Sequence, residues 1–455
     1  MHSDFLIADR DSLYLLPPSV QDWLPVNHLA RFIVDIVAQL DLTPLRDAYA
    51  GRGCKAYDPE MLLALLFYGY ATGTFSSRKL ELATHESIAF RYITGNSHPD
   101  HDTIANFRKR FLVELKPLFV QILTLAHEMK ILKVGKISID GTKIKANASK
   151  HQALSWGYAC KLEKQLKAEV ESLLRQAEQA DQSTISDGMS IPEELERREK
   201  RLEAISRAKR EIEHRAEERY EKEKAEHEKK LADRERKAQE RGKKPGGKPP
   251  KAPEPGVEDK DQVNLTDEES RIMPVSGGGF MQAYNAQASV DIDTMLIVGV
   301  HVTQHTNDKL EIQPALDELN RLPEKLGKVT EATADAGYFS DTNVGLCEKA
   351  GVTPYIAAGR ESHNQSLADR FSEPEPIAED ADAVTQMKHR LETKDGKALY
   401  AKRKCTVEPV FGVIKSVLGF RQFLLRGIEN VKGEWNLVGI AWNLKRLNVL
   451  RQTMA

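Results

Sequence analysis

Three acidic residues that lie far apart in the chain each belong to a short pattern that could present a carboxylate for chemistry. Asp140 closes an alternating run and is followed by glycine, and Asp335 closes a second such run and is followed by Ala-Gly. Both patterns predict an acid at the end of a β-strand, before a glycine turn. Glu408 comes shortly after Thr406, a residue type that caps helices, and is therefore predicted to lie in the first turn of a helix.

Carboxylates that converge on one point suit hard divalent cations. Mg²⁺ takes oxygen ligands, and two such ions can clamp the attacking and leaving oxygens of a displacement at phosphorus. The three acids therefore predict a phosphoryl-transfer site for Mg²⁺ or Mn²⁺, with two ions. Each acid alone also has a simpler interpretation, because a strand-end Asp often bonds its own backbone and an acid is favoured at a helix start. Their joint occurrence, beside basic segments, favours the metal site.

The same motifs resemble the catalytic core of the DDE-class transposases of bacterial insertion sequences, which have a ribonuclease H-like fold. The resemblance covers most of the chain. For the first two acids, the matching motifs are Asp140-Gly141-Thr142 and Asp335-Ala336-Gly337-Tyr338. The residues that are similar to the family's Tyr-Arg-Glu-Lys signature are Tyr400, Arg403, Glu408 and Lys415. Four residues separate Arg403 from Glu408 where the family has three, so Lys404 is the alternative basic residue.

This resemblance implies an enzyme that hydrolyses phosphodiester bonds at the ends of an element and then transfers the strands into target DNA. Asp140, Asp335 and Glu408 would be both the catalytic residues and the metal ligands. Double-stranded DNA, as element ends and as target, is the expected partner, and a homodimer is expected because two ends must be brought together. Basic and aromatic residues near the acids are expected to contact this DNA. They are Tyr400, Arg403, Lys404, Lys415 and Lys143.

Residues 1–130 are predicted to form a helical N-terminal domain. Short helices separated by glycine turns permit a helix-turn-helix reader of DNA, but a plain helical packing domain explains them equally well. The runs 57–63 and 99–108 resemble the N-terminal domain common in the same transposases, which is associated with binding the element's ends. The basic residues predicted to contact DNA from this domain are Arg78, Arg108, Lys109 and Arg110.

The remaining sequence predicts an interrupted catalytic domain. Residues 131–154 and 262–455 are expected to form an α/β ribonuclease H-like fold with a mixed sheet. Residues 155–261 are rich in Glu, Lys and Arg and predict a helical hairpin with coiled-coil spacing, followed by a Pro/Gly/Lys linker. Four other acids near the predicted site are interpreted as caps and turn residues: Asp291, Asp293, Asp308 and Asp341. Nearby histidines are poor ligands for Mg²⁺; these are His151, His301 and His305.

Composition limits the remaining possibilities. The 455 residues carry a formal net charge of −2, so DNA contacts must come from local basic patches and not from the overall charge. The apolar runs are too short to span a bilayer, which predicts a protein without a membrane segment. The four cysteines show no paired zinc spacing and favour the reducing cytoplasm. Two alternatives stay open: a ribonuclease H-like nuclease that cuts without joining, and a non-catalytic DNA-binding or scaffold relative.

Overall fold

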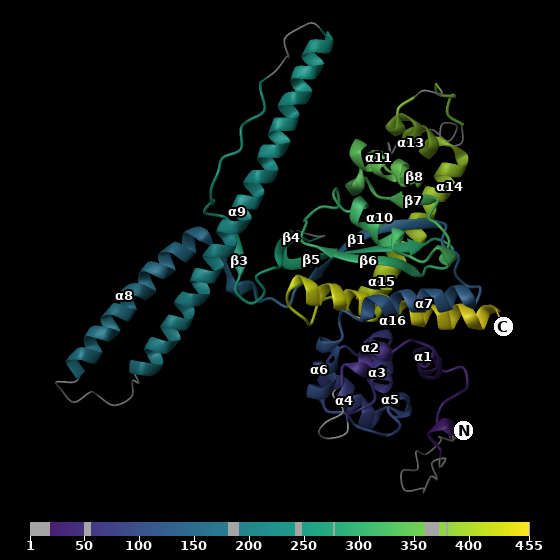
Figure 1. Cartoon of the computed structure of the whole chain (residues 1–455), viewed down its shortest axis with the longest axis horizontal. Coiled ribbons are helices and arrows are strands. Elements are labelled where there is room, and N and C mark those ends of the chain that lie inside the picture. Colours follow the sequence, from purple (N-terminus) through teal and green to yellow (C-terminus); the bar gives the residue numbers. More distant parts are fainter. Residues whose placement is uncertain are drawn as a thin grey trace, which may run out of the picture. The chain divides into compact units, whose positions relative to one another are not determined.

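The computed structural model describes residues 19–49, 56–180, 191–241, 248–275, 278–359, 373–378 and 381–454 (Figure 1). The chain divides into two compact units. The first unit comprises Met1–Thr142, Asn285–Leu424 and Glu429–Ala455. The second comprises Lys143–Tyr284 and Leu425–Ile428.

The N-terminal part of the first unit is helical, as its sequence predicts. Its helix α3 (Pro59–Ala71) has buried side chains on all sides, which is typical of a helix inside a core. The helix begins where Asp58 accepts a hydrogen bond from the N–H of Glu60, with proline in the first turn. The other elements of this part are η1 (Val20–Asp22), α1 (Leu29–Val37), α2 (Thr43–Asp47), α4 (Ser77–Glu86), α5 (Ile88–Ile93), α6 (His101–Arg110) and α7 (Leu115–Glu128).

A six-stranded mixed sheet follows, which confirms the predicted α/β class. Its strands are β1 (Lys136–Lys145), β4 (Arg271–Pro274), β5 (Phe280–Asp291), β6 (Ile297–Thr303), β7 (Glu331–Ala334) and β8 (Thr353–Ile356). The order is β4-β5-β1-β7-β8, and β6 also pairs with β5. The pairs β4–β5 and β5–β6 are antiparallel, whereas β1–β7 and β7–β8 are parallel.

Helices connect the later strands of this sheet and follow it in the chain. After β1, β5 and β6, the chain forms α10 (Ile312–Asn320), η3 (Glu324–Leu326), β7, η4 (Ala336–Tyr338), α11 (Asp341–Lys349) and β8. The late helices are α13 (Ala383–Glu392), α14 (Lys394–Lys402), η5 (Arg403–Cys405), α15 (Val407–Gly412), the π-helical turn η6 (Val413–Val417) and α16 (Ile428–Met454). The first acid thus lies on the first strand of the sheet and the third on a late helix.

Helices cover both faces of this sheet (Figure 1). A β-carbon placed on Gly299 of β6 would lie 3.6 Å from Leu319 of α10. A β-carbon placed on Gly439 of α16 would lie 3.5 Å from Val300, the next residue of β6, and 3.3 Å from Phe119 of α7. Successive residues of a strand point to opposite faces, so α10 covers one face while α16 covers the other together with α7.

Strand β1 extends further than its sequence predicts. The strand was expected to end at Asp140, but it continues to Lys145, and Gly141 forms no turn. A β-carbon at position 141 would overlap the side-chain amide of Gln287 and lie 2.8 Å from Oδ1 of Asp308. Glycine is therefore required here by close packing inside the sheet. By contrast, β7 ends directly before Asp335, as predicted.

The second unit contains two long helices, α8 (Trp156–Ala180) and α9 (Ile191–Arg241), which pack against each other (Figure 1). Its short elements are η2 (Lys150–Gln152), β2 (Ala153–Ser155) and β3 (Gln262–Asn264), and β2 pairs antiparallel with β3. The apolar core between them consists of Leu154, Ala159, Leu166, Ile205, Ala208, Ile212 and Val263. Residues 181–190, between the two helices, and residues 242–247, which belong to the predicted Pro/Gly/Lys linker, lie outside the described residues.

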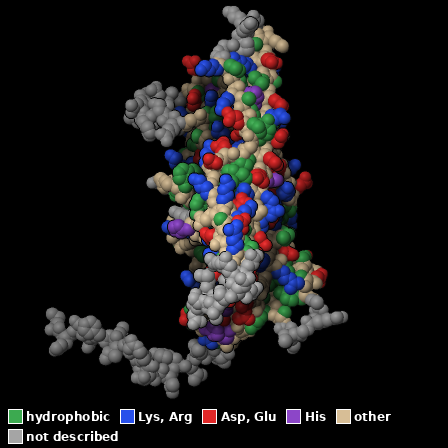
Figure 2. Space-filling model, turned by 90° about the vertical axis from the view of Figure 1, so that its left-hand side faces the viewer, with side chains coloured by type: hydrophobic (Ala, Val, Ile, Leu, Met, Phe, Trp, Pro, Cys, Tyr) green, Lys and Arg blue, Asp and Glu red, His purple; other side chains and the backbone are tan. Residues whose placement is uncertain are grey.

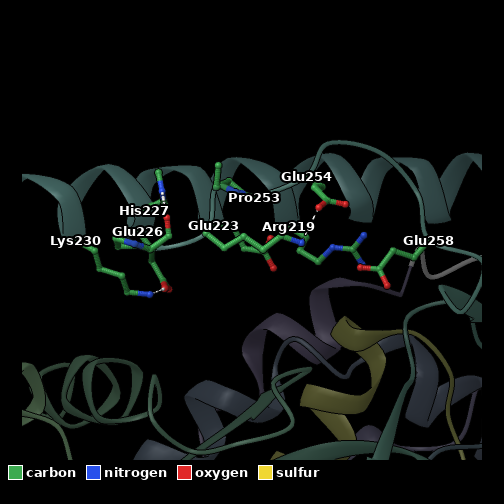
Figure 3. Close-up of a pocket in the computed structure, with 11 residues that line it drawn as sticks. Arg219, Glu223, Glu226, His227, Lys230, Pro253, Glu254 and Glu258 are labelled. Atoms are coloured by element: carbon green, nitrogen blue, oxygen red, sulfur yellow. Dashed lines mark hydrogen bonds and ion pairs between the residues drawn. The ribbon is translucent and has the colours of Figure 1, made fainter. Parts of the chain in front are cut away.

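The surface of the long helices carries both signs of charge. Figure 2 shows Lys and Arg interspersed with Asp and Glu over the described part of this face. A cavity of about 450 Å³ lies between α9 and the segment 250–258 (Figure 3). Its charged lining is paired internally, for example Lys230 with Glu226 at 3.2 Å and Lys251 with Glu254 at 2.7 Å. We therefore interpret this cavity as a solvated gap.

In the part of the chain that the structure describes, no helix is both long enough and apolar enough to cross a membrane.

Candidate active site

The pairing of β1 with β7 brings the first two acids together. These strands are parallel, and Ile139 is the register partner of Ala334. Asp140 follows Ile139, and Asp335 follows Ala334. The backbones of the two acids therefore lie about 4.8 Å apart, the usual spacing of paired strands. Each acid also bonds its local backbone: Oδ1 of Asp140 accepts the N–H of Gly141, and Oδ1 of Asp335 accepts the N–H of Gly337, both at 2.8 Å.

Arg403 joins the third acid to the first. Its Nη1 lies 3.1 Å from Oδ2 of Asp140, and its Nη2 lies 3.1 Å from Oε1 of Glu408. The guanidinium is largely buried, with 12% of the side chain exposed, whereas Glu408 is 48% exposed. Burial alone would lower the pKa of Arg403, but the surrounding carboxylates, Asp335 among them, raise it above its ordinary value. All three acids therefore act on one buried cation.

The surroundings of Asp140 perturb its carboxyl. Burial and then repulsion from Asp335 raise the pKa of this carboxyl to about 6, although Arg403 partly opposes both effects. Like charges held close together disfavour each other's ionisation. A divalent cation would relieve this repulsion, which is the electrostatic condition that a metal site needs.

Arg403, and not Lys404, is the basic residue beside the acids. Lys404 is exposed, and Arg403 makes both ion pairs. Lys415 lies half-buried near the same strand, where its Nζ donates to Oγ1 of Thr142 at 2.6 Å. Burial and the nearby Arg421 lower the pKa of Lys415.

Three other predicted residues occupy less direct positions. Tyr400 is half-buried and packs beside an apolar cluster that includes Tyr355. Lys143 is half-buried on β1 and belongs to the second unit. The hydroxyl of Thr406 was expected to cap the helix of Glu408, but it donates to the carbonyl of Lys402 at 2.7 Å, so the side chain makes no cap.

The sequence reasoning missed a fourth carboxylate, that of Asp308. This residue was interpreted as a cap or turn residue, yet its Oδ1 accepts hydrogen bonds from Asn285 and Gln287 of β5, both at 2.7 Å. It lies beside Gly141, and its charge contributes to the raised pKa of Asp140. A sequence signal existed: Asn285 and Gln287 are spaced two apart in a strand and therefore share one face, and buried amides need partners.

The other acids and histidines behave as predicted or serve the fold. Asp291 accepts hydrogen bonds from the N–H and hydroxyl of Thr294 in the turn after β5. His301 and His305 bond to the buried Glu311 at 2.8 and 2.7 Å. The two histidines and Glu311 therefore form a structural cluster that is not part of the site at Asp140.

The three carboxylates are chemically suited to a hard divalent cation, although they are not arranged as the ligands of one ion. Among the described residues, no three of His, Cys, Asp and Glu lie close enough together to hold one ion. The guanidinium of Arg403 lies between Asp140 and Glu408 and supplies the positive charge there. Asp140, Asp335 and Glu408 supply carboxylate oxygens only, which is the ligand type that Mg²⁺ and Mn²⁺ prefer.

In the N-terminal helices, the structure corrects one predicted DNA contact. Arg108 is buried, with 7% exposed, and its Nη1 donates to the hydroxyl of Tyr70 at 3.1 Å and to the carbonyl of Phe75 at 2.9 Å. It faces the protein interior because these groups and the nearby Glu434 need its donors and charge. Arg78 and Lys109 are exposed. Arg110 is also exposed, and its guanidinium stacks 5.0 Å from the ring of Tyr49.

Comparison with known families gives two matches. The model of a family described as a transposase domain (DUF772) matches residues 18–110. The model of a family described as a transposase DDE domain matches residues 374–448. The first match spans the helices from α1 to α6, and the second spans the stretch that contains Arg403, Glu408 and Lys415. No curated protein and no solved structure matches the chain.

Proposed function

Because the chain belongs to the DDE-class transposases of insertion-sequence type, we propose that it cleaves DNA at the ends of its element and joins them to target DNA. Asp140, Asp335 and Glu408 are the acids of this reaction. The observation that carries the proposal is their convergence: two come from adjacent parallel strands, and Arg403 ties the third to the first. Family membership makes DNA the substrate, while the cleavage and joining chemistry is our inference.

The three carboxylates would hold two Mg²⁺ or Mn²⁺ ions, and these ions would supply the charge needed to activate a water or a 3′-hydroxyl and to stabilise the leaving oxygen. The protein's part is to fix the acids on a rigid sheet. The position of Asp140 favours this use, since burial and then repulsion from Asp335 raise its pKa, and a bound cation would offset both effects. Arg403 would have to share its two carboxylates with the metal, and its guanidinium would then be available to a DNA phosphate. Its buried Nε, without a partner among the described residues, fits that role.

Basic residues around the acids would position the DNA backbone. Lys415 and Arg403 lie beside the carboxylates, and Lys404 is exposed nearby. Phosphate contacts of this kind fix register and make binding fall with salt. Arg78, Lys109 and Arg110 of the N-terminal helices would bind the element's ends. A homodimer would bring two ends together.

The test is cleavage and joining of DNA that carries the repeats flanking the gene, with Mg²⁺ or Mn²⁺, by the full chain and by Asp335→Asn. Asp341→Asn is the matched control, because Asp341 is an exposed acid six residues further along, in the first turn of α11, where Ser340 provides the cap. We expect the control to cut and join, and Asp335→Asn to lose both activities.

Other results would reject the proposal in distinct ways. Metal-dependent cutting without joining would identify a nuclease, although the match to the N-terminal transposase domain favours transposition. DNA binding without cleavage in any protein would identify a scaffold relative. Equal cleavage by the full chain and Asp335→Asn would remove Asp335 from the chemistry.

A further inference from the structure

Asp308 lies in the segment between β6 and α10, and its carboxylate is held by the neighbouring strand β5. The side chains of Asn285 and Gln287 both donate to Oδ1, each at 2.7 Å. Both amides are fully buried. The oxygen of the Gln287 amide in turn accepts the hydroxyl of Tyr338, and the Asn285 amide also donates to the carbonyl of His305 at 3.2 Å. Buried amides so arranged fix the direction of the carboxylate.

The direction is toward the acids already described. A β-carbon placed on Gly141, the residue after Asp140, would lie 2.8 Å from Oδ1 of Asp308. A β-carbon placed on Gly337 would lie 3.7 Å from Oδ2 of Asp308 and 2.9 Å from Oδ1 of Asp335. The side-chain position of Gly337 therefore lies between an oxygen of Asp308 and an oxygen of Asp335, and glycine leaves room there.

Asp308 thus adds a third carboxylate beside Asp140 and Asp335. Carboxylates held close together repel one another, and this repulsion costs free energy unless a cation compensates for it.

We propose that Asp308 is a fourth acid of the site and contributes to holding the divalent cation beside Asp140 and Asp335. Asn285 and Gln287 are positioning residues that fix its carboxylate. This inference rests on the proposed function, because it assigns a further residue to the same metal-binding site.

The test measures binding of Mn²⁺ to the full chain, from the loss of the free-ion signal in electron paramagnetic resonance. Asp308→Asn keeps a carbonyl oxygen for the two amides and removes only the charge. Its matched control is Asp317→Asn, because Asp317 is an exposed acid on α10. Loss of a group that supports a metal site weakens affinity about 10–100-fold. We expect weakening of at least about tenfold in Asp308→Asn, a similar or larger loss in Asp335→Asn, and wild-type affinity in Asp317→Asn.

The amide contacts make a second prediction for the same assay. Gln287→Met removes one donor to Asp308 and should weaken Mn²⁺ binding less than Asp308→Asn does. A purely structural role for Gln287 would lower the unfolding temperature without changing the affinity of the folded protein, and this result would remove it as a positioning residue.

Each result decides between the two proposals. If Asp335→Asn weakens Mn²⁺ binding while Asp308→Asn binds like Asp317→Asn, the fourth acid is rejected and the proposed function stands. If the wild type binds no Mn²⁺, or Asp335→Asn binds normally, both are rejected. If Asp308→Asn does not fold, Fe²⁺-dependent hydroxyl-radical cleavage of the wild-type backbone replaces it. Cuts near 308 as well as near 140 and 335 would support the fourth acid, and cuts near 140 and 335 alone would reject it.

Discussion

Replacing Arg108 tests whether a charge that looks like a DNA contact in the sequence in fact stabilises the protein interior. Arg108 donates to the hydroxyl of Tyr70 at 3.1 Å, and this hydroxyl donates to Oε1 of Glu434 at 2.9 Å. Glu434 lies on α16 and is 0% exposed. Its other carboxylate oxygen accepts the N–H of Leu424 at 2.9 Å. The buried negative charge therefore has a buried positive charge one hydroxyl away.

The magnitude follows from these contacts. Breaking a buried ion pair by removing one partner costs about 3–5 kcal/mol. Arg108 and Glu434 are bridged by Tyr70, and Nε of Arg108 has no partner in the described chain, so its removal relieves one unsatisfied donor. We therefore expect Arg108→Gln to lower the free energy of unfolding by about 3 kcal/mol, the lower end of that range. Tyr70→Phe should lower it by about 1–3 kcal/mol, because Arg108 and Glu434 each lose a hydrogen bond.

The assay is equilibrium unfolding in urea, followed by tryptophan fluorescence. Trp435 is a suitable reporter, because its ring stacks on Phe420, which in turn contacts Tyr70. A loss of about 3 kcal/mol corresponds to a midpoint roughly 1 M lower in urea. Lys109→Gln is the control: Lys109 follows Arg108 on the same helix but is exposed. It should unfold like the wild type and bind DNA more weakly at low salt.

One pattern would refute this reasoning. If Arg108→Gln unfolded at the wild-type urea concentration and lost as much DNA affinity as Lys109→Gln, the guanidinium would be a surface contact and the buried network would be wrong.

Three further predictions concern the first unit. The pKa of buried Glu311 would be raised by burial alone, but hydrogen bonds from two histidines lower it to about 2. Glu311→Gln should therefore cost roughly 3 kcal/mol above about pH 5, and this difference should vanish as the pH falls toward 2, as measured by urea unfolding across that range. Gly141→Ala should cost about 1–3 kcal/mol by overpacking against Gln287 and weaken Mn²⁺ binding, whereas Gly135→Ala, with open space around it, should do neither. Lys415→Met should bind element-end DNA more weakly, with a salt dependence reduced by about one charge, as measured by titration at several salt concentrations.

The strands that precede or carry the first two acids were largely predictable, because the sequence patterns that indicate them are local. Alternation with period two predicts a strand wherever one face is buried, and β7 ends directly before Asp335 as the pattern indicates. The extension of β1 beyond Asp140 was not predictable in the same way. A glycine after an acid usually marks a turn, and only the three-dimensional position of Gln287 shows that Gly141 serves close packing.

Charge alone could not separate buried from exposed arginines. Arg108, Lys109 and Arg110 are consecutive, yet only the first is buried. A helix turns by 100° per residue, so neighbours in sequence face different surroundings, and the apolar residues on the same side as Arg108 indicate its orientation. Ile104 lies one turn before Arg108 and is fully buried. The helical spacing between Ile104 and Arg108 thus predicts that Arg108 is buried, whereas the run of three basic residues alone suggests exposure.

The omission of Asp308 has a different cause, since its partners are remote in sequence. A cap or turn interpretation uses only the residues that flank an acid, and Asp308 does lie in a turn, where its carbonyl accepts the N–H of Glu311 at 3.1 Å. The decisive signal is on β5, where Asn285 and Gln287 interrupt a buried strand on one face. Two buried amides on the strand next to Asp140 require acceptors. Because β6 pairs with β5, an acid in the segment after β6 can reach these amides. Asp308 is such an acid.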